Sequence, residues 1–341
     1  MTGRPSGTQS APVRLSIVVE WANTRLHGKL RALDLVDTLG RQWREITAGD
    51  FPSTLPPAAG PFLERLDGRP QLLIVSGEPV DADLEEGIRR RLPAGFDVAV
   101  HVAEGLEYYP LKNRGAGLAT GDLLLLVDSD VLPDPGWLAH LLGSFAQPGI
   151  DVVCGQTYVA PTDLVARAFA LGWTYSLRDD AGRLFQPSKF YANNIAFRMD
   201  VFRRTGFRPL GRRSRGGCSQ LRRDLEPLGI AVWENRWAHV DHPPPTSARH
   251  MVVRALAHGR DHYLKRSEER SLENMTSSLS VAARRLRRGV HRTFCHWKRV
   301  GLRRRELPAV LAIVAGYYGF FALGGVLTHL HPDAMARRFR V

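Results

Sequence analysis

Cysteine is scarce in this sequence, since 341 residues contain only Cys154, Cys218 and Cys295. An odd number at such wide spacing excludes a disulfide framework and a cysteine-based zinc site, so we expect a reducing compartment. Residues 1–13, MTGRPSGTQSAPV, lack the apolar stretch of a secretory signal peptide, and we expect a disordered leader there. With 44% hydrophobic residues, the remainder can bury a globular core.

Acidic residues are few in the C-terminal part of the chain. From Pro243 to Glu306 there are 16 Lys and Arg against 5 Asp and Glu, and the residues after Leu330 add a net charge of +2. Because the whole chain carries +13, the part before Pro243 is net neutral. We therefore expect no nucleic-acid partner, and the basic segment instead favours an anionic membrane surface.

One long uncharged run occurs, from Leu307 to Leu330. Its length predicts a transmembrane or deeply inserted helix over 307–330, with a glycine-rich buried core helix as the alternative. Upstream, 246–306 predicts a basic amphipathic membrane-surface segment or, alternatively, a solvated basic helix. The apolar stripe of that segment comprises Leu279, Ala283, Leu286, Val290, Phe294, Trp297 and Gly301. The dense charge before the span places the catalytic domain on the cytoplasmic side, with 331–341 as a short tail.

The neutral body alternates between two hydrophobic periods. Segments 14–20, 70–76, 96–102 and 122–128 have the composition of buried strands, while 23–46 and 81–92 have a helical period and a third helix starts near 112. This alternation predicts an α/β fold with a mostly parallel sheet and helices on both faces. The sequence after the first strand, VVEWANTR, has no glycine, which excludes a dinucleotide-binding dehydrogenase.

Two carboxylates follow the most apolar of these strands. Asp128 and Asp130 lie one residue apart where the chain leaves Leu123 to Val127. In parallel sheets ligands bind beyond the carboxyl ends of the strands, so both side chains should reach the ligand site. Paired carboxylates suit Mg²⁺ or Mn²⁺, which keeps coordination sites open for phosphate oxygens.

The surrounding sequence, LKNRGAGLATGDLLLLVDSDVLPDPGWL, resembles the central signature of the family 2 glycosyltransferases. These are inverting nucleotide-sugar enzymes of the GT-A fold. The resemblance covers about Leu15 to His242, implies a GT-A domain over 14–245, and assigns donor-side roles to Lys112, Asn113, Gly115 and Asp122. A second segment, YANNIAFRMDVFRRTGF, is similar to the acceptor side of the family and places Asn193, Asn194 and Arg198 there.

The chain also departs from the family at the donor side. The positions after the first two strands hold Glu20 with Asn23, and Glu78, where the family has other residues. These side chains can hydrogen-bond a base or ribose, so they remain donor-binding candidates, although the preferred base is not readable. The resemblance further implies His242 as a third metal ligand beside Asp128 and Asp130, or else a histidine that fixes the exit loop.

The largest departure concerns the general base. The Glu-Asp pair of the family aligns with Gly217 and Cys218, and a thiol with an ordinary pKa of about 8.5 is mostly protonated at neutral pH. Three interpretations stay open: a relocated carboxylate, an acceptor that is already nucleophilic, such as a phosphate, or a protein that binds sugar nucleotide without turnover. The candidates for the relocated base are Asp224, Glu226 and Glu234.

The expected function is a metal-dependent, membrane-anchored enzyme that moves one sugar from a nucleotide donor to a lipid-linked or cell-envelope glycan. Trp233 stands where processive synthases have Gln, three residues before Arg236, so we expect single transfer. The alternatives are a catalytically impaired sugar-nucleotide-binding protein and a nucleotidyltransferase. The donor, the acceptor and the oligomeric state cannot be predicted.

Overall fold

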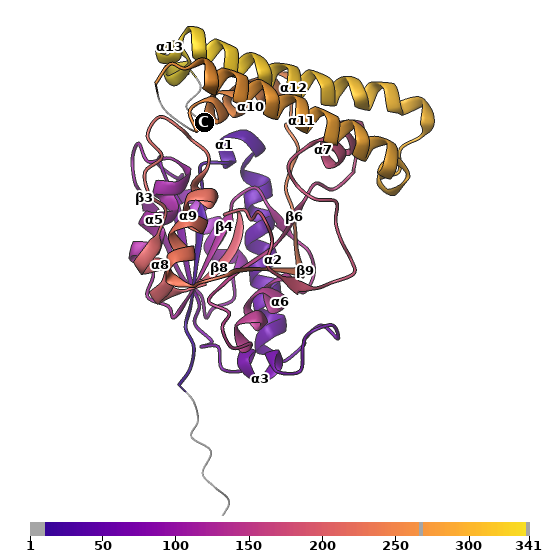
Figure 1. Ribbon diagram of the computed structural model, residues 1–341. Helices are drawn as coiled ribbons and strands as arrows, with labels where there is room; N and C mark the ends of the chain where they lie inside the picture. Colours follow the sequence, from indigo (N-terminus) through magenta and orange to yellow (C-terminus); the bar gives the residue numbers. More distant parts are fainter. Residues whose placement is uncertain (1–10, 266–268, 339–341) are drawn as a thin grey trace, which may run out of the picture.

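The computed structural model describes residues 11–265 and 269–338, and its core is one nine-stranded mixed sheet (Figure 1). The strand order is β3-β2-β1-β4-β8-β6-β9-β5, with β7 also paired to β9. Pairs among the first four strands are parallel, and β8 runs antiparallel between β4 and β6. The strands are β1 (Leu15–Glu20), β2 (Gln71–Ser76), β3 (Asp97–Val102), β4 (Leu123–Asp128), β5 (Leu132–Pro133), β6 (Val152–Tyr158), β7 (Leu184–Phe185), β8 (Asn194–Arg198) and β9 (Val232–Asp241).

Helices cover both faces of this sheet, which confirms the predicted α/β fold. Strand β4 shows why: Leu123, Leu125 and Val127 are buried in the core on one face, while Leu124 and Leu126 are buried on the other. Such a strand is apolar at every position because both of its faces exclude water. The first face carries α2 (Lys29–Thr47), α3 (Ala59–Leu63), α4 (Ala82–Arg91) and α6 (Trp137–Gly143), and the second α5 (Tyr108–Leu118), α8 (Met199–Thr205) and α9 (Gly217–Leu225).

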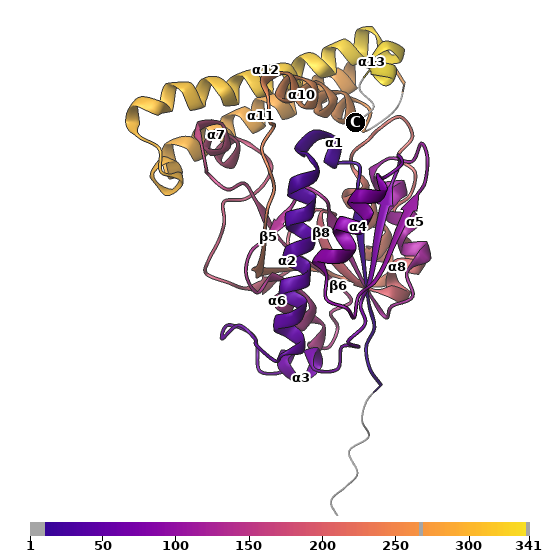
Figure 2. The ribbon, with the colours of Figure 1, turned by 180° about the vertical axis from the view of Figure 1, so that it is seen from behind.

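Two predicted helices differ from the structure, one by a break and one by an earlier start. The segment 23–46 breaks at Gly28, whose φ of 83° belongs to the left-handed region, and this separates α1 (Thr24–His27) from α2. Figure 2 shows α1 at the end of α2 next to the helices above it. Helix α5 starts at Tyr108 instead of near Lys112. Of the predicted leader, residues 1–10 lie outside the described residues, and Val13 forms a β-bridge with Leu66.

A layer of helices lies across the carboxyl edge of the sheet (Figure 1). We call it the helical layer; it consists of α7 (Leu164–Gly172), α10 (Ala248–Tyr263), α11 (Leu272–His296), α12 (Leu307–Leu330) and α13 (Pro332–Arg338). Short 3₁₀ turns η1 (Ser144–Ala146), η2 (Glu226–Leu228), η3 (Trp297–Val300) and η4 (Arg304–Glu306) complete the chain. Residues 339–341 of the predicted tail lie outside the described part.

The glycines of the long apolar run allow α12 to pack closely on α10. A Cβ atom at Gly259 would lie 1.9 Å from the Phe321 carbonyl oxygen, and one at Gly324 would lie 2.3 Å from that of Leu256. The central tyrosines also have partners inside the layer, because Tyr318 donates to the Gly172 carbonyl at 2.6 Å. Gly324 and Tyr318 of this run therefore serve helix packing, as Gly259 does on α10, whereas Gly316 and Gly319 have open space beside them.

Helix α12 contacts the rest of the chain at both of its ends. Glu306 lies 3.8 Å from Arg167 on α7, and Asp333 at the opposite end lies 3.1 Å from Arg212 of the body. Helix α12 therefore packs within the helical layer, and the expectation of a transmembrane or deeply inserted helix over 307–330 stays a prediction. The predicted amphipathic segment 246–306 divides likewise: α10 is packed inside the layer, and α11 keeps exposed apolar residues such as Leu279 and Phe294.

Candidate active site

Three acidic side chains meet at the carboxyl edge of the sheet. Glu20 and Asp128 are cross-strand partners at the ends of β1 and β4, and Asp130 follows two residues later. The Asn23 amide nitrogen lies between them, donating to Glu20 at 2.8 Å and reaching Asp128 at 3.4 Å and Asp130 at 3.3 Å. Burial, and then the charge of Asp128, raises the pKa of Glu20 well above its ordinary value. The structure therefore brings together the acids that the sequence placed at two separate strand ends.

Asp128 is held by partners from α5. Lys112 Nζ donates to it at 2.6 Å, and the Tyr108 hydroxyl reaches both carboxylate oxygens at 2.9 and 2.8 Å. Lys112 is fully buried, so its ammonium group serves Asp128. Burial raises the pKa of Asp128, and the nearby Lys112 opposes this shift. Asp128 is thus held in place by Tyr108 and Lys112, and the ammonium group of Lys112 balances its negative charge.

Asp130 faces histidines. Its Oδ2 atom lies 3.4 Å from His27 Nε2 and 3.8 Å from His242 Nε2. Burial lowers the pKa of both imidazoles to about 3, so both are neutral near pH 7 and keep a lone pair for a ligand. Both ring nitrogens of His27 are buried without a hydrogen-bond partner in the described structure. Sequence reasoning missed His27 because only the fold brings α1 next to Asp130.

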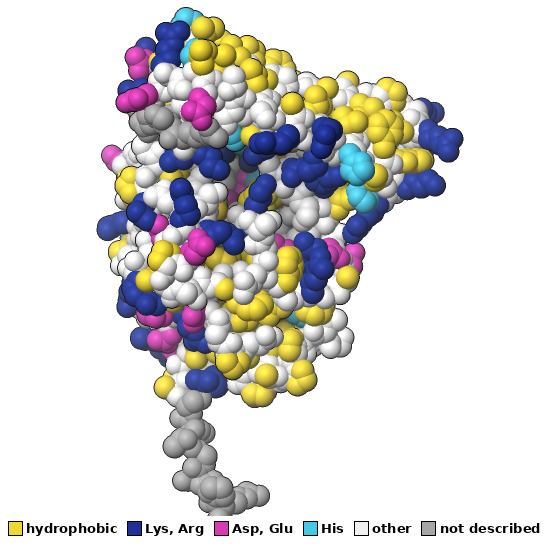
Figure 3. All heavy atoms as spheres, viewed as in Figure 1, with side chains coloured by type: hydrophobic (Ala, Val, Ile, Leu, Met, Phe, Trp, Pro, Cys, Tyr) yellow, Lys and Arg dark blue, Asp and Glu magenta, His cyan; other side chains and the backbone are white. Residues whose placement is uncertain are grey.

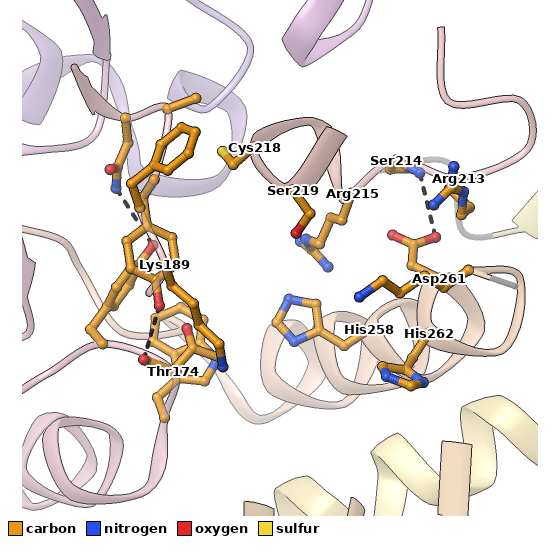
Figure 4. Close-up of a pocket in the computed structure, with 18 of the residues that line it drawn as sticks. Thr174, Lys189, Arg213, Ser214, Arg215, Cys218, Ser219, His258, Asp261 and His262 are labelled. Atoms are coloured by element: carbon orange, nitrogen blue, oxygen red, sulfur yellow. Dashed lines mark hydrogen bonds between the residues drawn. The ribbon is translucent and has the colours of Figure 1, made fainter. Parts of the chain in front are cut away.

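A cavity of about 710 Å³ joins this edge to the helical layer. Asn23, Asp128 and His242 line its inner end, and α9, α10 and α11 supply much of the remaining wall. Figure 4 shows Arg215 and Ser219 on one side and His258 and Asp261 on the other. Its lining is strongly basic, with Lys189, Arg213, Arg215, Arg222, Arg254, Lys265, Arg284, Arg285 and Arg288.

Comparison with known proteins agrees with this geometry. The profile described as glycosyl transferase family 2 matches residues 101–212, which run from the end of β3 through β8 and α8. A curated relative, the glucosyl-dolichyl phosphate glucuronosyltransferase of Haloferax volcanii, is 27% identical over 165 residues, covering 43% of this chain and 51% of the relative. These two matches support a family 2 glycosyltransferase. It spans about half the length of that relative.

A solved structure shares the fold of this chain. It is the mannosyltransferase PcManGT from Pyrobaculum calidifontis in complex with GDP-Man and Mn²⁺, with a TM-score of 0.50 and 15% sequence identity. The match covers 95% of this chain and 89% of that chain, so it extends beyond the sheet into the helical layer. The GT-A-type fold expected from the resemblance is therefore confirmed.

Several residues of the family signature lie away from the cavity. Asn113 is bonded to the Phe207 backbone in both directions, at 2.6 and 3.0 Å. A Cβ atom at Gly115 would lie 2.3 Å from Val18, so this glycine lets α5 approach the sheet. Asp122 accepts the Arg14 amide at the opposite edge of the sheet. Together with Lys112, these residues support the fold of the site in this structure, without lining the cavity as donor-side residues would.

The other predicted binding residues divide in the same way. Asn193 lines the cavity and accepts the Thr157 hydroxyl at 3.0 Å. Asn194 accepts the Trp137 indole at 2.8 Å, and Arg198 pairs with Asp151 at 3.3 Å, so neither belongs to the cavity wall. Glu78 is exposed and pairs with Arg25 at 2.7 Å.

Cys218 lines the cavity in the first turn of α9, as its place in the family signature implies. Its sulfur lies 3.6 Å from the Tyr109 hydroxyl. Burial raises the pKa of the thiol, which keeps it protonated at neutral pH. Cys218 therefore contacts the site without providing a base.

None of the three candidates for a relocated base lines the cavity among the described residues. Asp224 pairs with Arg208 at 2.8 Å, Glu226 is exposed in η2, and Glu234 pairs with Arg236 at 2.9 Å. The two carboxylates that do line it are Asp128, held by Lys112, and Asp261, which lies 2.8 Å from Arg260.

The residues around Asp130 fit a divalent cation only in part. Within residues 11–265 and 269–338, no group of three or more His, Cys, Asp or Glu side chains is arranged to hold a metal ion. Nevertheless, Asp130 offers a carboxylate oxygen beside two neutral imidazoles, and His27 has no other polar partner there. This donor set suits a cation that also takes ligands from substrate phosphate.

Proposed function

We propose that this glycosyltransferase moves a single sugar from a nucleotide-sugar donor to a lipid-linked or cell-envelope glycan acceptor, in a reaction that depends on Mn²⁺ or Mg²⁺. The observation that carries this proposal is the position of Asp130. It lies at the carboxyl end of β4, beside two neutral histidines and next to the inner end of the cavity. A carboxylate so placed can serve a diphosphate leaving group through a bound cation.

Asp130 and His242 would hold the cation, and His27 is a further ligand that we add to this set. Asp128 belongs to the predicted ligand set as well, although its oxygens already accept from Lys112 and Tyr108. When bound, the ion would neutralise the charge that develops on the leaving diphosphate. The Mn²⁺ and GDP-Man bound to PcManGT support a cation of this kind.

On the donor side we propose a role for Asn23 and Glu20, because Asn23 lines the cavity and contacts all three acids. Glu78 remains a candidate for contact with the nucleoside, since it is exposed at the end of β2. On the acceptor side we propose Asn193, which faces the cavity. Lys112 would act indirectly, by fixing Asp128.

The acceptor is proposed to be lipid-linked for two reasons. The Haloferax volcanii relative is named for a glucosyl-dolichyl phosphate. In addition, one described helix, Arg304–Leu330, is long and apolar enough to cross a membrane by length and composition, with 39% of its most apolar window buried in the protein. Helix α12 also packs closely on α10, which favours a placement of the whole helical layer on the membrane over a span by α12 alone. We propose that the helical layer rests on an anionic membrane with the body on the cytoplasmic side.

The absence of a free carboxylate at the base position bears on the acceptor. Cys218 is protonated and the three alternative acids lie outside the cavity. This favours an acceptor whose nucleophile is already anionic over a relocated base.

Incubation of the purified protein with a panel of nucleotide sugars and an envelope lipid extract tests the function. We expect release of a nucleoside diphosphate that requires Mn²⁺ or Mg²⁺ and stops in EDTA. Release of pyrophosphate would instead indicate a nucleotidyltransferase. Full activity in EDTA would contradict the proposed cation.

A further inference from the structure

The cavity is unbalanced in charge. Among the described residues, nine Lys and Arg side chains line it, against Asp128 and Asp261. Both carboxylates already have cationic partners, Lys112 at 2.6 Å and Arg260 at 2.8 Å, and neither of these partners lines the cavity. Figure 3 shows Lys and Arg side chains gathered along the hollow between the helical layer and the body. The lining therefore carries a large positive charge that its own acids do not neutralise.

Two of these cations have donor atoms that are buried and unused. Arg215 Nη1 and Arg254 Nε are both inaccessible to solvent and have no hydrogen-bond partner among the described residues. Burial, and then the charge of Arg254, lowers the pKa of Arg215. A buried donor without a partner costs free energy, so such groups call for a ligand or ion that satisfies them.

The neighbouring cations of the cavity repel one another. Burial lowers the pKa of Lys189, and the charges of Arg288 and Arg285 lower it further. All three line the same cavity, in which Arg285 and Arg288 come from α11. Like charges brought together in a partly buried site repel one another, and a bound anion turns this repulsion into attraction.

The cations lie next to the carboxylate end of the cavity. The Arg254 guanidinium is 4.6 Å from the centroid of the Trp173 ring. That ring lies 5.5 Å from the His242 ring, which in turn is 3.8 Å from Asp130. Only the Trp173 ring would therefore lie between a ligand held by Arg254 and the His242 end of the site proposed for the leaving diphosphate.

We propose that the cationic cluster of Lys189, Arg215, Arg254, Arg285 and Arg288 binds the phosphate group of a phosphorylated acceptor. This inference rests on the proposed function, which supplies the donor at the Asp130 end. Guanidinium groups match phosphate because their planar donors pair with its oxygens, and several of them can share one dianion. A neutral glycan alone would leave the buried donors of Arg215 and Arg254 unsatisfied.

Calorimetric binding of geranyl phosphate, with geraniol as the phosphate-free control, tests the site. We expect the phosphate to bind and geraniol not to bind at the same concentrations. Arg215→Gln and Arg254→Gln should each weaken binding about 10- to 100-fold, the range for losing one hydrogen bond to a charged group. Arg203→Gln removes the same charge from exposed α8 outside the cavity and should bind as the wild type does.

Thermal unfolding separates ligand binding from a role in folding. If the arginines serve the phosphate, the two cavity variants should melt no lower than wild type and should lose the increase in Tm that geranyl phosphate gives. Variants that melt lower and yet bind geranyl phosphate with unchanged affinity would overturn the proposal.

Two further arms identify the ligand. Glucose 6-phosphate is the soluble counterpart of geranyl phosphate, and tighter binding of one or the other assigns the phosphate to a soluble or a lipid acceptor. Weakened binding of a nucleoside diphosphate in Arg254→Gln, equal to that of geranyl phosphate, would overturn the proposal by assigning the cations to the donor. If Asp130→Ala abolishes donor binding and keeps geranyl phosphate binding, the two sites are separate. If no nucleotide sugar binds to wild type, the proposed function fails while the phosphate site stands.

Discussion

The acids at the sheet edge and the arginines on the opposite side of the cavity differ in whether the protein supplies their partners. At the sheet edge two of the acids have built-in partners, Asn23 for Glu20 and Lys112 for Asp128. On the helical side, buried donor atoms of Arg215 and Arg254 have none among the described residues. Glu20 and Asp128 are therefore held by the protein itself, whereas the buried donors of Arg215 and Arg254 need a ligand. This difference predicts that variants at the sheet edge lose stability or chemistry, while variants of the arginines lose binding.

The largest effect on the free energy of unfolding should come from breaking the buried ion pair at the sheet edge. Replacement of Lys112 by Met leaves the buried Asp128 without its ammonium partner, and losing one member of a buried pair costs about 3–5 kcal/mol. Urea denaturation should show this loss in the free energy of unfolding. Lys29→Met breaks the exposed pair with Asp81 and should cost no more than about 1 kcal/mol. Equal losses in the two variants would contradict the comparison.

The chemical role of the sheet edge depends on Asp130. Replacement of Asp130 by Ala should lower kcat/KM about 100-fold or more, roughly 3 kcal/mol of transition-state stabilisation, because the leaving diphosphate loses its cation. The measurement is nucleoside diphosphate release with Mn²⁺. Asp83→Ala, at an exposed position of α4, is the matched control and should stay near wild type. Unchanged turnover in the Asp130 variant would rule out this role.

Buried histidines of the body should make its stability depend on pH. His140 on α6 is buried with Nε2 3.0 Å from the Thr54 hydroxyl, and burial lowers its pKa to about 4. Between pH 6.5 and 4 the unfolded imidazole binds a proton and the folded one does not, so stability is complete above pH 6.5 and falls as the pH drops.

Between pH 7.5 and 5, His140 should account for roughly 1–2 kcal/mol of lost stability, and His140→Gln should lack this part. Urea titrations of both proteins at the two pH values measure it. Parallel losses in the two proteins would show that His140 is not the group responsible.

The smallest effect concerns the outer face of the helical layer. Leu323 is 42% exposed on α12, and replacing it by Glu should weaken binding to phosphatidylglycerol vesicles about tenfold, through lost apolar contact and added repulsion. Leu228→Glu makes the same change at a 47% exposed position of the body and should leave vesicle binding unchanged. Vesicle flotation measures both. Binding that is equal in the two variants would place the membrane contact elsewhere.

Local sequence patterns determined much of the body. Unbroken apolar runs such as Leu123 to Val127 identified strands that are buried on both faces, because that property belongs to each segment by itself. The position of Asp128 and Asp130 at the carboxyl edge followed from the same pattern, and the family signature pointed to the GT-A fold. The distribution of charge, neutral before Pro243 and basic after it, also came directly from the sequence.

Only the tertiary structure decided which side chains form the site. Lys112 and Asp128 are close in sequence, yet their pairing depends on how α5 packs against the sheet. His27 and Asp130 come together although they are far apart in the sequence. The cationic cluster likewise joins residues from Lys189 to Arg288 that no local pattern links. The apolar run 307–330 had the composition of a membrane span, and only the structure shows its close glycine contacts with α10 in the helical layer. Periodicity records whether one face of a segment avoids water, but it does not record what covers that face.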